Sequence, residues 1–173
     1  MDKKKRMMFV LDKDYYFITI KLLIILNCLN CYKDKFIDYR KLAFIIGFIK
    51  DDKDIDLYKK NIRRSIDLNI FERERLINIY CNGNMDQPLI KRVLFFLAKK
   101  RIIILEKNVK FNCIDVVLVK DEKLDEILSS ENLYNDIDKV KNIYDEFTRL
   151  RSIKYKSFIE RIFGDSEVAK WEC

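Results

Sequence analysis

The chain has 173 residues, of which 49% are hydrophobic and 13% aromatic, so it can bury the core of one domain. Its 35 Lys and Arg against 28 Asp and Glu give a net charge of +7, and this composition excludes disordered and fibrous classes. The sequence contains no histidine, the commonest general base near neutral pH and the commonest metal ligand. Ser-His-Asp and Cys-His catalysis and most catalytic zinc sites are therefore excluded, and we expect a binding protein, not an enzyme.

The cysteines and the first apolar stretch bear on the expected location of the protein. The five cysteines are scattered and odd in number, unlike those of a secreted disulfide scaffold. No signal peptide is expected, because the apolar stretch 15–26 contains Lys21 and no small-residue cleavage site follows it. The stretch is also too short to span a bilayer. We expect a cytoplasmic protein without membrane contact, whose cysteines are small core residues.

Basic residues concentrate toward the N-terminus. Residues 1–100 hold 22 basic and 13 acidic residues, a net charge of +9, whereas residues 101–173 hold 13 basic and 15 acidic residues, a net charge of −2. The densest cluster, Lys3–Arg6, lies in a predicted basic N-terminal arm, residues 1–14. Such an arm either contacts phosphates or is a solvated terminus that aids solubility. The charge alone suits nucleic acid and an acidic protein equally.

Strongly apolar helices are predicted in the first third of the chain. Residues 15–32 have only a narrow polar strip, and residues 36–50 repeat this pattern, so both segments must be buried in a core or against a partner. The acidic stretch 51–56 then supplies N-cap candidates for a basic helix over residues 57–68. This third segment is expected on the surface.

A helix-turn-helix is predicted next. Residues 72–80 can form a short helix, and Cys81–Asn84 is typical of a turn, with Gly83 available for a positive φ. The second helix is expected over residues 88–99, since Asp86 can cap it and Pro88 suits its first turn.

A β-hairpin, the wing of a winged helix, is predicted to follow. The β-branched run 102–105 indicates a strand, residues 106–108 a tight turn, and residues 109–119 a return strand. Asp121 then caps a last short helix that ends near Leu128. Helix, turn, helix, strand, turn and strand is the order of a winged helix-turn-helix.

The last part of the chain predicts a helical tail. Apolar residues recur at spacings of three and four over residues 133–150, and a shorter apolar face over residues 155–163 is stopped by Gly164. Trp171 is either a core plug for the tail or an exposed anchor for a partner.

The expected fold class is therefore mainly α (α+β). A winged helix-turn-helix domain over residues 15–128 contains the N-terminal apolar helices and the small β-wing. The N-terminal arm, residues 1–14, precedes it, and a C-terminal helical tail, residues 129–173, follows it.

The second helix of the predicted helix-turn-helix carries the candidate site. On a helical wheel its core face consists of Leu89, Ile90, Val93, Leu94, Phe96 and Leu97. Phe95 lies on the opposite side, between Lys91 and Lys99 at i−4 and i+4. A large aromatic side chain framed by cations indicates a surface for a protein partner or for nucleic acid, unless the chain's own terminal helices cover it. The candidate contact residues are Lys91, Arg92, Phe95, Lys99, Lys100, Arg101 and Lys107.

Basic residues at the predicted tip of the wing, Lys107 and Lys110, are typical of a hairpin that lies against a DNA backbone. Acidic residues dilute this region: Glu106, Asp115, Asp121 and Glu122. A solvated hairpin is an equal alternative.

No metal or cofactor site is expected. Cys28 and Cys31 match C-x-x-C, but they lie within an apolar helix, without a second such pair or a histidine, so we interpret them as structural. The three glycines are isolated and form no phosphate-binding loop. Neighbouring carboxylates such as Asp51 and Asp52 are interpreted as caps and ion pairs.

Five segments carry a resemblance to a known family. In chain order they read YYFITIKLLIILNCLN, FIDYRKLAFIIGFI, IKRVLFFLAKKRIIILEKN, DVVLVKDEKLDEIL and YNDIDKVKNIYDEF. In this order of features, over most of residues 15–163, the chain resembles the small middle component of bacterial three-component ABC systems, the group that includes the Lamassu anti-phage defence systems. The resemblance brings no catalytic motif and no family-defined contact residue.

The resemblance implies a winged-helix accessory subunit without catalysis of its own. Such a subunit works in a hetero-oligomer beside an SMC-like or Rad50-like ATPase and an effector that is often a nuclease. The face framed by Lys91, Phe95 and Lys99 and the helical tail would bind the ATPase or the effector, while the basic N-terminal half would face DNA. The subunit would hold the effector inactive and couple DNA sensing to its release.

Two alternatives come from other classes. The first is a free-standing, dimeric winged-helix transcription regulator that reads the major groove with Lys91, Arg92 and Phe95. The second is a small metal-dependent nuclease that uses only Asp and Glu and needs a convergent acidic cluster.

Overall fold

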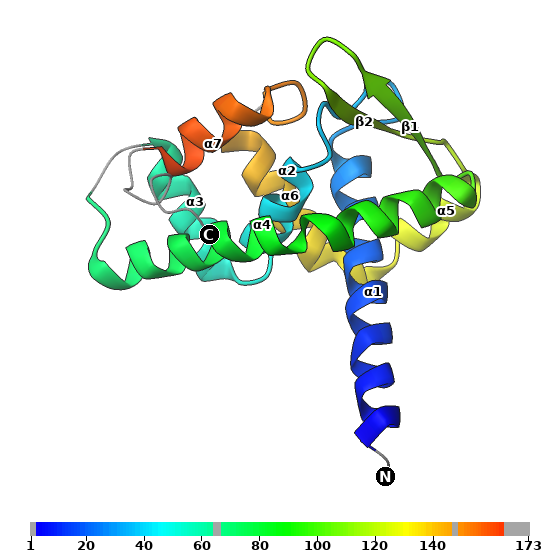
Figure 1. Ribbon diagram of the computed structural model, residues 1–173, viewed down its shortest axis with the longest axis horizontal. Coiled ribbons are helices and arrows are strands. Elements are labelled where there is room, and N and C mark those ends of the chain that lie inside the picture. The colour runs from blue at the N-terminus through cyan, green and yellow to red at the C-terminus, as the bar shows by residue number, and fades with distance from the viewer. Residues whose placement is uncertain (1–2, 64–66, 147–148, 165–173) are drawn as a thin grey trace.

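The computed structural model describes residues 3–63, 67–146 and 149–164, with side chains from residue 15 onward. The first four elements are α1 (Lys3–Cys28), α2 (Lys41–Phe48), α3 (Asp52–Arg63) and α4 (Ile70–Lys99). They are followed by β1 (Ile103–Asn108), β2 (Cys113–Leu118), α5 (Glu122–Leu128), a 3-10 turn η1 (Glu131–Leu133), α6 (Tyr134–Glu146) and α7 (Tyr155–Phe163). The chain is mainly helical with a small antiparallel sheet, which confirms the α+β class (Figure 1).

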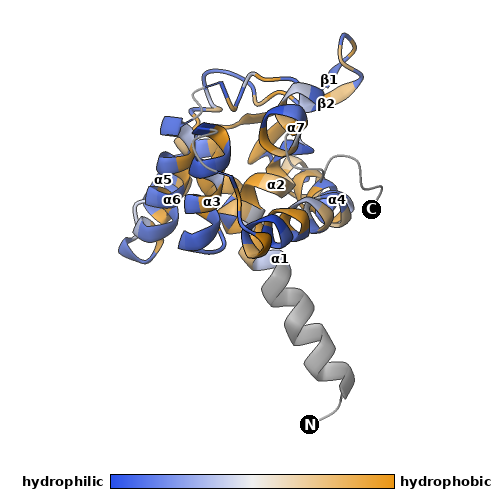
Figure 2. Ribbon diagram, turned by 90° about the vertical axis from the view of Figure 1, so that its left-hand side faces the viewer, coloured by the Kyte–Doolittle hydropathy of each residue, from blue (hydrophilic) through white to orange (hydrophobic). Residues whose placement is uncertain are grey.

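Helix α2 lies at the centre of the hydrophobic core. All of its residues except Gly47 are buried, as its apolar sequence KLAFIIGF predicts. Phe44 of α2 packs among Tyr80, Tyr155, Phe158 and Phe163, with ring centroids 5.5 to 6.2 Å away. Three of these rings come from α7 and one from α4, so α2 joins distant parts of the chain. Figure 2 shows hydrophobic residues gathered between the helices and hydrophilic residues facing outward.

The predicted tail contributes to the same core as the rest of the chain. Its buried apolar side chains are Val140, Ile143, Leu150, Phe158, Ile162 and Phe163. They pack in one cluster with residues of α1, α2 and α4. The two amphipathic segments of the tail thus bury their apolar faces within this chain.

Helix α1 begins at Lys3 and runs without a break across residue 14, so the predicted arm is helical from Lys3 onward. It ends at Cys28, earlier than predicted. Asn30 takes a left-handed conformation with φ 54°, and the Cys31 N–H donates to the Leu26 carbonyl at 2.9 Å. These features form a Schellman cap, which closes a helix end.

The next two helices differ from the prediction at their N-termini. Helix α2 begins at Lys41, because Phe36 pairs with Val116 in an isolated β-bridge. Helix α3 begins at Asp52 and ends at Arg63, where residues 57–68 were expected. Asp51 accepts a hydrogen bond from the Lys53 N–H at 3.2 Å, so it caps the helix at the start of the acidic stretch.

The predicted turn at Cys81–Asn84 is wrong. Ile70–Lys99 is one continuous helix, with Pro88 in its interior. Gly83 is needed for close packing: a Cβ at this position would lie 2.5 Å from Phe44 Cδ1. Buried residues on both sides of Gly83, from Leu76 to Leu97, pack into the core and stabilise one continuous helix despite the unfavourable Gly and Pro. The helix-turn-helix unit expected here is therefore replaced by α4.

The hairpin is confirmed, but its turn lies further along the chain. Residues 106–108 belong to β1, which pairs with β2 from Ile103 opposite Leu118 to Asn108 opposite Cys113. Residues 109–112 form the turn, in which Asn112 has φ 48° and the Asn108 side chain accepts from the Phe111 N–H. The other edge of β2 is covered by residues 31–39, which exchange backbone hydrogen bonds with it.

The C-terminal elements match the prediction closely. Asp121 caps α5 by accepting from the Lys123 N–H at 2.9 Å, and α7 spans Tyr155–Phe163 and stops at Gly164. Trp171 lies outside the described residues. Among the residues that are described, no helix has the length and apolarity needed to cross a membrane.

Candidate interaction surface

Helix α4 is a well-terminated scaffold for the predicted site. At its N-terminus, the Asn69 side chain accepts from the Glu72 N–H at 2.9 Å, and the Glu72 side chain accepts from the Asn69 N–H at 3.1 Å. This reciprocal pair is a capping box. At its C-terminus, Arg101 is left-handed with φ 61°, and the Ile102 N–H donates to the Leu97 carbonyl at 3.0 Å. The helix is closed at both ends by local hydrogen bonds.

The predicted core face of this helix is correct except at Phe96. Ile90, Val93, Leu94 and Leu97 are buried, whereas Phe96 is 56% exposed. Its ring faces solvent beside Lys100, whose Nζ lies 5.7 Å from the ring centroid. Phe96 lies at the edge of the apolar face of α4, where the neighbouring elements no longer cover the helix.

Phe95 is exposed as predicted, with 51% of its surface accessible. The described parts of the terminal helices do not cover it. Lys91 Nζ lies 6.0 Å from the Phe95 ring centroid, as expected for a residue at i−4 on the same helix face. Two adjacent phenylalanines on one helix are thus open to solvent, each beside a lysine.

The surrounding cations are exposed as well. Lys91, Arg92, Lys99, Lys100 and Arg101 all face solvent, and in the described part of the chain no carboxylate oxygen lies within 4.0 Å of them. We use the name α4 surface for Lys91, Arg92, Phe95, Phe96, Lys99, Lys100 and Arg101.

Lys107, the last predicted contact residue, does not lie at a hairpin tip. It is exposed on β1, opposite Ile114 of β2. The tip carries Val109, which is 83% exposed, and Lys110. The structure thus gathers six of the seven predicted residues at the C-terminal end of α4 and places the seventh on the hairpin.

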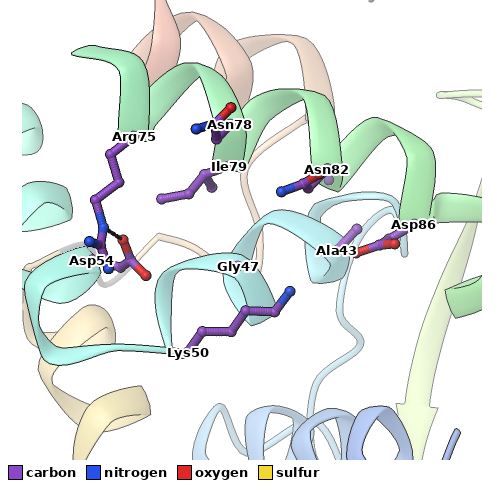
Figure 3. Close-up of a pocket in the computed structure, with 10 residues that line it drawn as sticks. Ala43, Gly47, Lys50, Asp54, Arg75, Asn78, Ile79, Asn82 and Asp86 are labelled. Atoms are coloured by element: carbon purple, nitrogen blue, oxygen red, sulfur yellow. Dashed lines mark hydrogen bonds and ion pairs between the residues drawn. The ribbon is translucent and has the colours of Figure 1, made fainter. Parts of the chain in front are cut away.

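A groove beside α4 was not predicted from the sequence. It consists of two hollows of about 170 and 270 Å³ that share Ala43, Lys50 and Asp86. The first hollow lies between α2, α3 and α4 and is drawn in Figure 3. The second continues between α1 and α4, where Phe17 and Leu89 line it. A one-dimensional pattern does not reveal the groove, because its walls come from four helices.

Charged groups in the groove are of two kinds. Arg75 is engaged: it pairs with Asp54 and donates to Asp51 Oδ2 at 2.7 Å, which with the Lys53 N–H lowers the pKa of Asp51. The side chains of Lys50 and Asp86 have no hydrogen bond or ion pair within the described residues, nor do those of Asn78 and Asn82. The groove therefore offers donors and acceptors to a ligand.

A buried polar cluster also escaped prediction. Asp115 on β2 is fully buried and accepts from the Asp38 N–H at 3.1 Å and from Asn108 Nδ2 at 2.8 Å. Lys35 Nζ lies 3.3 Å from Asp115 Oδ2. Asp38 in turn binds the Arg40 guanidinium, with Nη2 2.6 Å from Oδ2. These bonds hold the hairpin to the segment before α2, so Asp115, which the sequence analysis counted only among the acidic residues that dilute the charge of the hairpin, has a structural role.

Lys41 is the most deeply buried cation in the described chain. Its Nζ donates to the carbonyls of Leu150, Arg151 and Ile153 at 2.7 to 3.2 Å and lies 4.5 Å from the Phe36 ring centroid. Burial lowers the pKa of Lys41 to about 7. Lys41 thereby ties α2 to the turn between α6 and α7.

The C-x-x-C cysteines are free thiols. Cys31 is buried, and burial raises its pKa to about 12, while Cys28 is half-buried. This agrees with the structural interpretation. Over the described residues, no group of three or more Cys, Asp or Glu side chains is arranged to hold a metal ion.

Comparison with known proteins gives no relative. No protein-family model, curated protein sequence or solved structure shows a significant match to this chain. The functional argument therefore rests on the sequence resemblance, the fold and the α4 surface.

Proposed function

We propose that this chain is a non-catalytic accessory subunit of an SMC-like or Rad50-like ATPase complex in anti-phage defence, and that the α4 surface binds the ATPase. The subunit bridges the ATPase and an effector in a cytoplasmic hetero-oligomer. This proposal extends the resemblance described above and is supported by the character of the α4 surface.

One observation carries the proposal: Phe95 and Phe96 are both more than half exposed on a capped helix, and exposed cations surround them. Exposed aromatic side chains on a rigid element are typical anchors of protein interfaces, where they dominate the binding free energy. The nearby lysines and Arg92 favour a partner with acidic groups.

Co-expression with the ATPase tests the proposal. We expect a coiled-coil ATPase with Walker motifs to be encoded beside this chain and to co-purify with it. Replacing both phenylalanines (Phe95→Asp with Phe96→Asp) should weaken the complex at least about tenfold, because two aromatic anchors are replaced by charges. Isothermal titration calorimetry of the purified proteins measures the change.

Phe71→Asp is the matched control for this experiment. Phe71 lies on the same helix and is 80% exposed, but it is outside the α4 surface. The control variant should bind like the wild type. Unchanged affinity of the double variant, or the absence of a neighbouring ATPase that binds, would contradict the proposal.

Direct DNA binding is a second candidate function, favoured by the exposed cations of the α4 surface, which have no carboxylate partner within the described residues. It does not require a helix-turn-helix, because lysines that contact phosphates bind any sequence. Replacing Lys91, Lys99 and Lys100 by Gln should then lower the slope of log affinity against log salt by about 1 for every phosphate that the variant no longer binds. Fluorescence anisotropy with duplex DNA measures this slope, with Lys53→Gln as the control. Absence of binding at moderate salt would exclude this candidate.

A further inference from the structure

The cysteines of the described residues are in two states. Cys28, Cys31 and Cys113 are free thiols, whereas Cys81 is disulfide-bonded. Cys81 therefore departs from the prediction that all the cysteines are small core residues. The sequence contains five cysteines, and the fifth is Cys173, which lies outside the described residues. By elimination within the chain, Cys173 is the cysteine that can complete the bond.

Cys81 lies on α4 beside the end of α7. It is half-buried and follows Tyr80, whose ring centroid is 5.1 Å from that of Phe163, the last residue of α7. The Asn61 side chain of α3 also donates to the Ile162 carbonyl, so the last turn of α7 is fixed at this place. The chain thus leaves α7 next to the turn of α4 that carries Cys81.

The length of the following segment is compatible with a bond to Cys81. Cys173 follows Phe163 by ten residues in the sequence, and an extended chain of that length spans up to about 35 Å. A disulfide requires its two Cα atoms to lie about 4.4 to 6.8 Å apart. Because the segment starts close to Cys81, it is long enough to return there while α4 and α7 keep their positions.

The accessibility of the thiols distinguishes Cys81 from the buried cysteines. Cys31 and Cys113 are buried, and burial raises the pKa of Cys31 to about 12 and that of Cys113 to about 11. Thiol–disulfide exchange needs a thiolate and access for the reagent, so these two thiols exchange slowly. Half-buried Cys81 is open to a small disulfide or thiol.

We propose that Cys81 and Cys173 form a reversible disulfide that links the segment after α7 to α4. The oxidant is a low-molecular-weight disulfide such as glutathione disulfide. The thiolate of one cysteine attacks a glutathione sulfur and releases one glutathione, and the second thiolate then attacks the protein sulfur of the mixed disulfide and releases another. Two protein thiols and one glutathione disulfide thus give one protein disulfide and two glutathione molecules.

The direction of this exchange depends on the surroundings. Excess reduced glutathione reverses it, so the bond is open in a reducing cytoplasm and closes when glutathione becomes oxidised. This inference concerns the chain alone and does not depend on the proposed function.

The bond should stabilise the packing of α7. Its covalent ring runs from residue 81 to residue 173 and includes α7, which places Phe158 and Phe163 against Phe44. Closing a ring of this length restricts the unfolded chain, which stabilises the folded state. The oxidised chain should therefore resist unfolding better than the reduced chain.

Thiol counting on the full chain tests whether the bond forms. The chain is equilibrated with glutathione disulfide or with reduced glutathione, unfolded without reductant and labelled with iodoacetamide. The oxidised chain should take up three labels and the reduced chain five. Peptide mapping by mass spectrometry should find Cys81 and Cys173 in one linked pair. Five labels after oxidation, a different pair, glutathione adducts without a linked pair, or a covalent dimer through Cys81 would overturn the inference.

Thermal unfolding tests whether the bond links α7 and α4 in the folded chain. The oxidised wild type should unfold at a temperature at least about 5 °C higher than the reduced wild type. Cys81→Ser and Cys173→Ser should each abolish this difference, whereas Cys28→Ser, at a half-buried free thiol, should keep it. Equal unfolding temperatures of the oxidised and reduced wild type would refute the stabilising link.

Discussion

Lys41 shows how a charge is accommodated inside this protein. Three backbone carbonyls and the face of Phe36 surround its ammonium. The carbonyls belong to the turn after α6, which is not part of a helix. No helical N–H group therefore donates to them. Removing the donor leaves the Leu150 and Ile153 carbonyls without this partner, whereas the Arg151 carbonyl still accepts from the Ile37 N–H at 3.0 Å. Lys41→Met should therefore lower the free energy of unfolding by about 2 to 4 kcal/mol in urea denaturation.

The lowered pKa of Lys41 predicts how stability depends on pH. Because the folded value is about 7 and the ordinary value is 10.5, the unfolded chain binds more protons between these limits. The free energy of unfolding should then rise as pH increases from about 7, by at most about 1.4 kcal/mol per pH unit. Buried Cys31 and Cys113, whose pKa values are raised, oppose this rise above about pH 9.

Urea titrations between about pH 7 and pH 8.5 measure this dependence. Lys41→Met should lack the rise, and the exposed control Lys53→Met should keep it. A neutral Lys41 retains two N–H donors for the surrounding carbonyls, whereas Met has none. Deprotonation of Lys41 therefore stabilises the wild type, although Lys41→Met is less stable than the wild type. Parallel pH profiles of the wild type and Lys41→Met would contradict the argument.

Arg101 occupies a backbone position that favours glycine. Its φ of 61° is left-handed, which costs about 1 kcal/mol for a residue with a Cβ. Arg101→Gly should raise the unfolding free energy by about 0.5 to 1 kcal/mol and reduce binding to the partner of the α4 surface. Lys100→Gly, at a right-handed position with φ −81°, should lower the unfolding free energy. Higher stability with unchanged binding would remove Arg101 from the binding surface.

At the scale of elements, Gly83 decides whether α2 and α4 can meet. Alanine favours helix over glycine by about 1 kcal/mol, but here its Cβ would lie 2.5 Å from Phe44 Cδ1. Phe44 cannot move away, because four rings surround it. Gly83→Ala should therefore lower the unfolding free energy by about 1 to 3 kcal/mol. Asn82→Ala, on the exposed face one residue earlier, should be neutral or slightly stabilising, and a stabilising Gly83→Ala would disprove close packing.

This glycine also explains where sequence reasoning failed. Gly83 and Pro88 suggested a turn and a new helix, because local propensity cannot show that Phe44, thirty-nine residues earlier, requires the missing Cβ. Local patterns succeeded where no distant contact overrides them, as at the Asp121 cap and over Tyr155–Phe163, and failed at Cys81–Asn84. The α-helical periodicity correctly exposed Phe95 but placed Phe96 in the core, since a wheel does not show where the covering elements end.

The candidate site likewise contains features that local spacing predicts and features that it does not. The exposed cations of α4 follow from helical spacing, which is a local property. The groove and the Asp38 and Asp115 cluster join residues from segments far apart in the chain, so no spacing rule reveals them. The hydrogen bond from the Asp38 N–H to Asp115 spans a sequence separation of 77 residues.

At the scale of the whole molecule, the helical tail belongs to the core. A chain that ends at residue 128 loses the buried side chains of α6 and α7, including Phe158 and Phe163 beside Phe44. It would also expose the apolar faces of α1 and α2. We expect this fragment to show no cooperative unfolding transition by circular dichroism in urea. A sharp transition would establish residues 1–128 as an independent domain.

The uninterrupted course of α4 has a mechanical consequence. With 30 residues the helix is about 45 Å long, and it reaches from the contact with α3 to the start of the hairpin. A tilt of about 5° at one end displaces the other by about 4 Å. A force applied at the C-terminal turns would therefore be transmitted along α4 to the wall of the groove, whereas a turn at Cys81–Asn84 would absorb it.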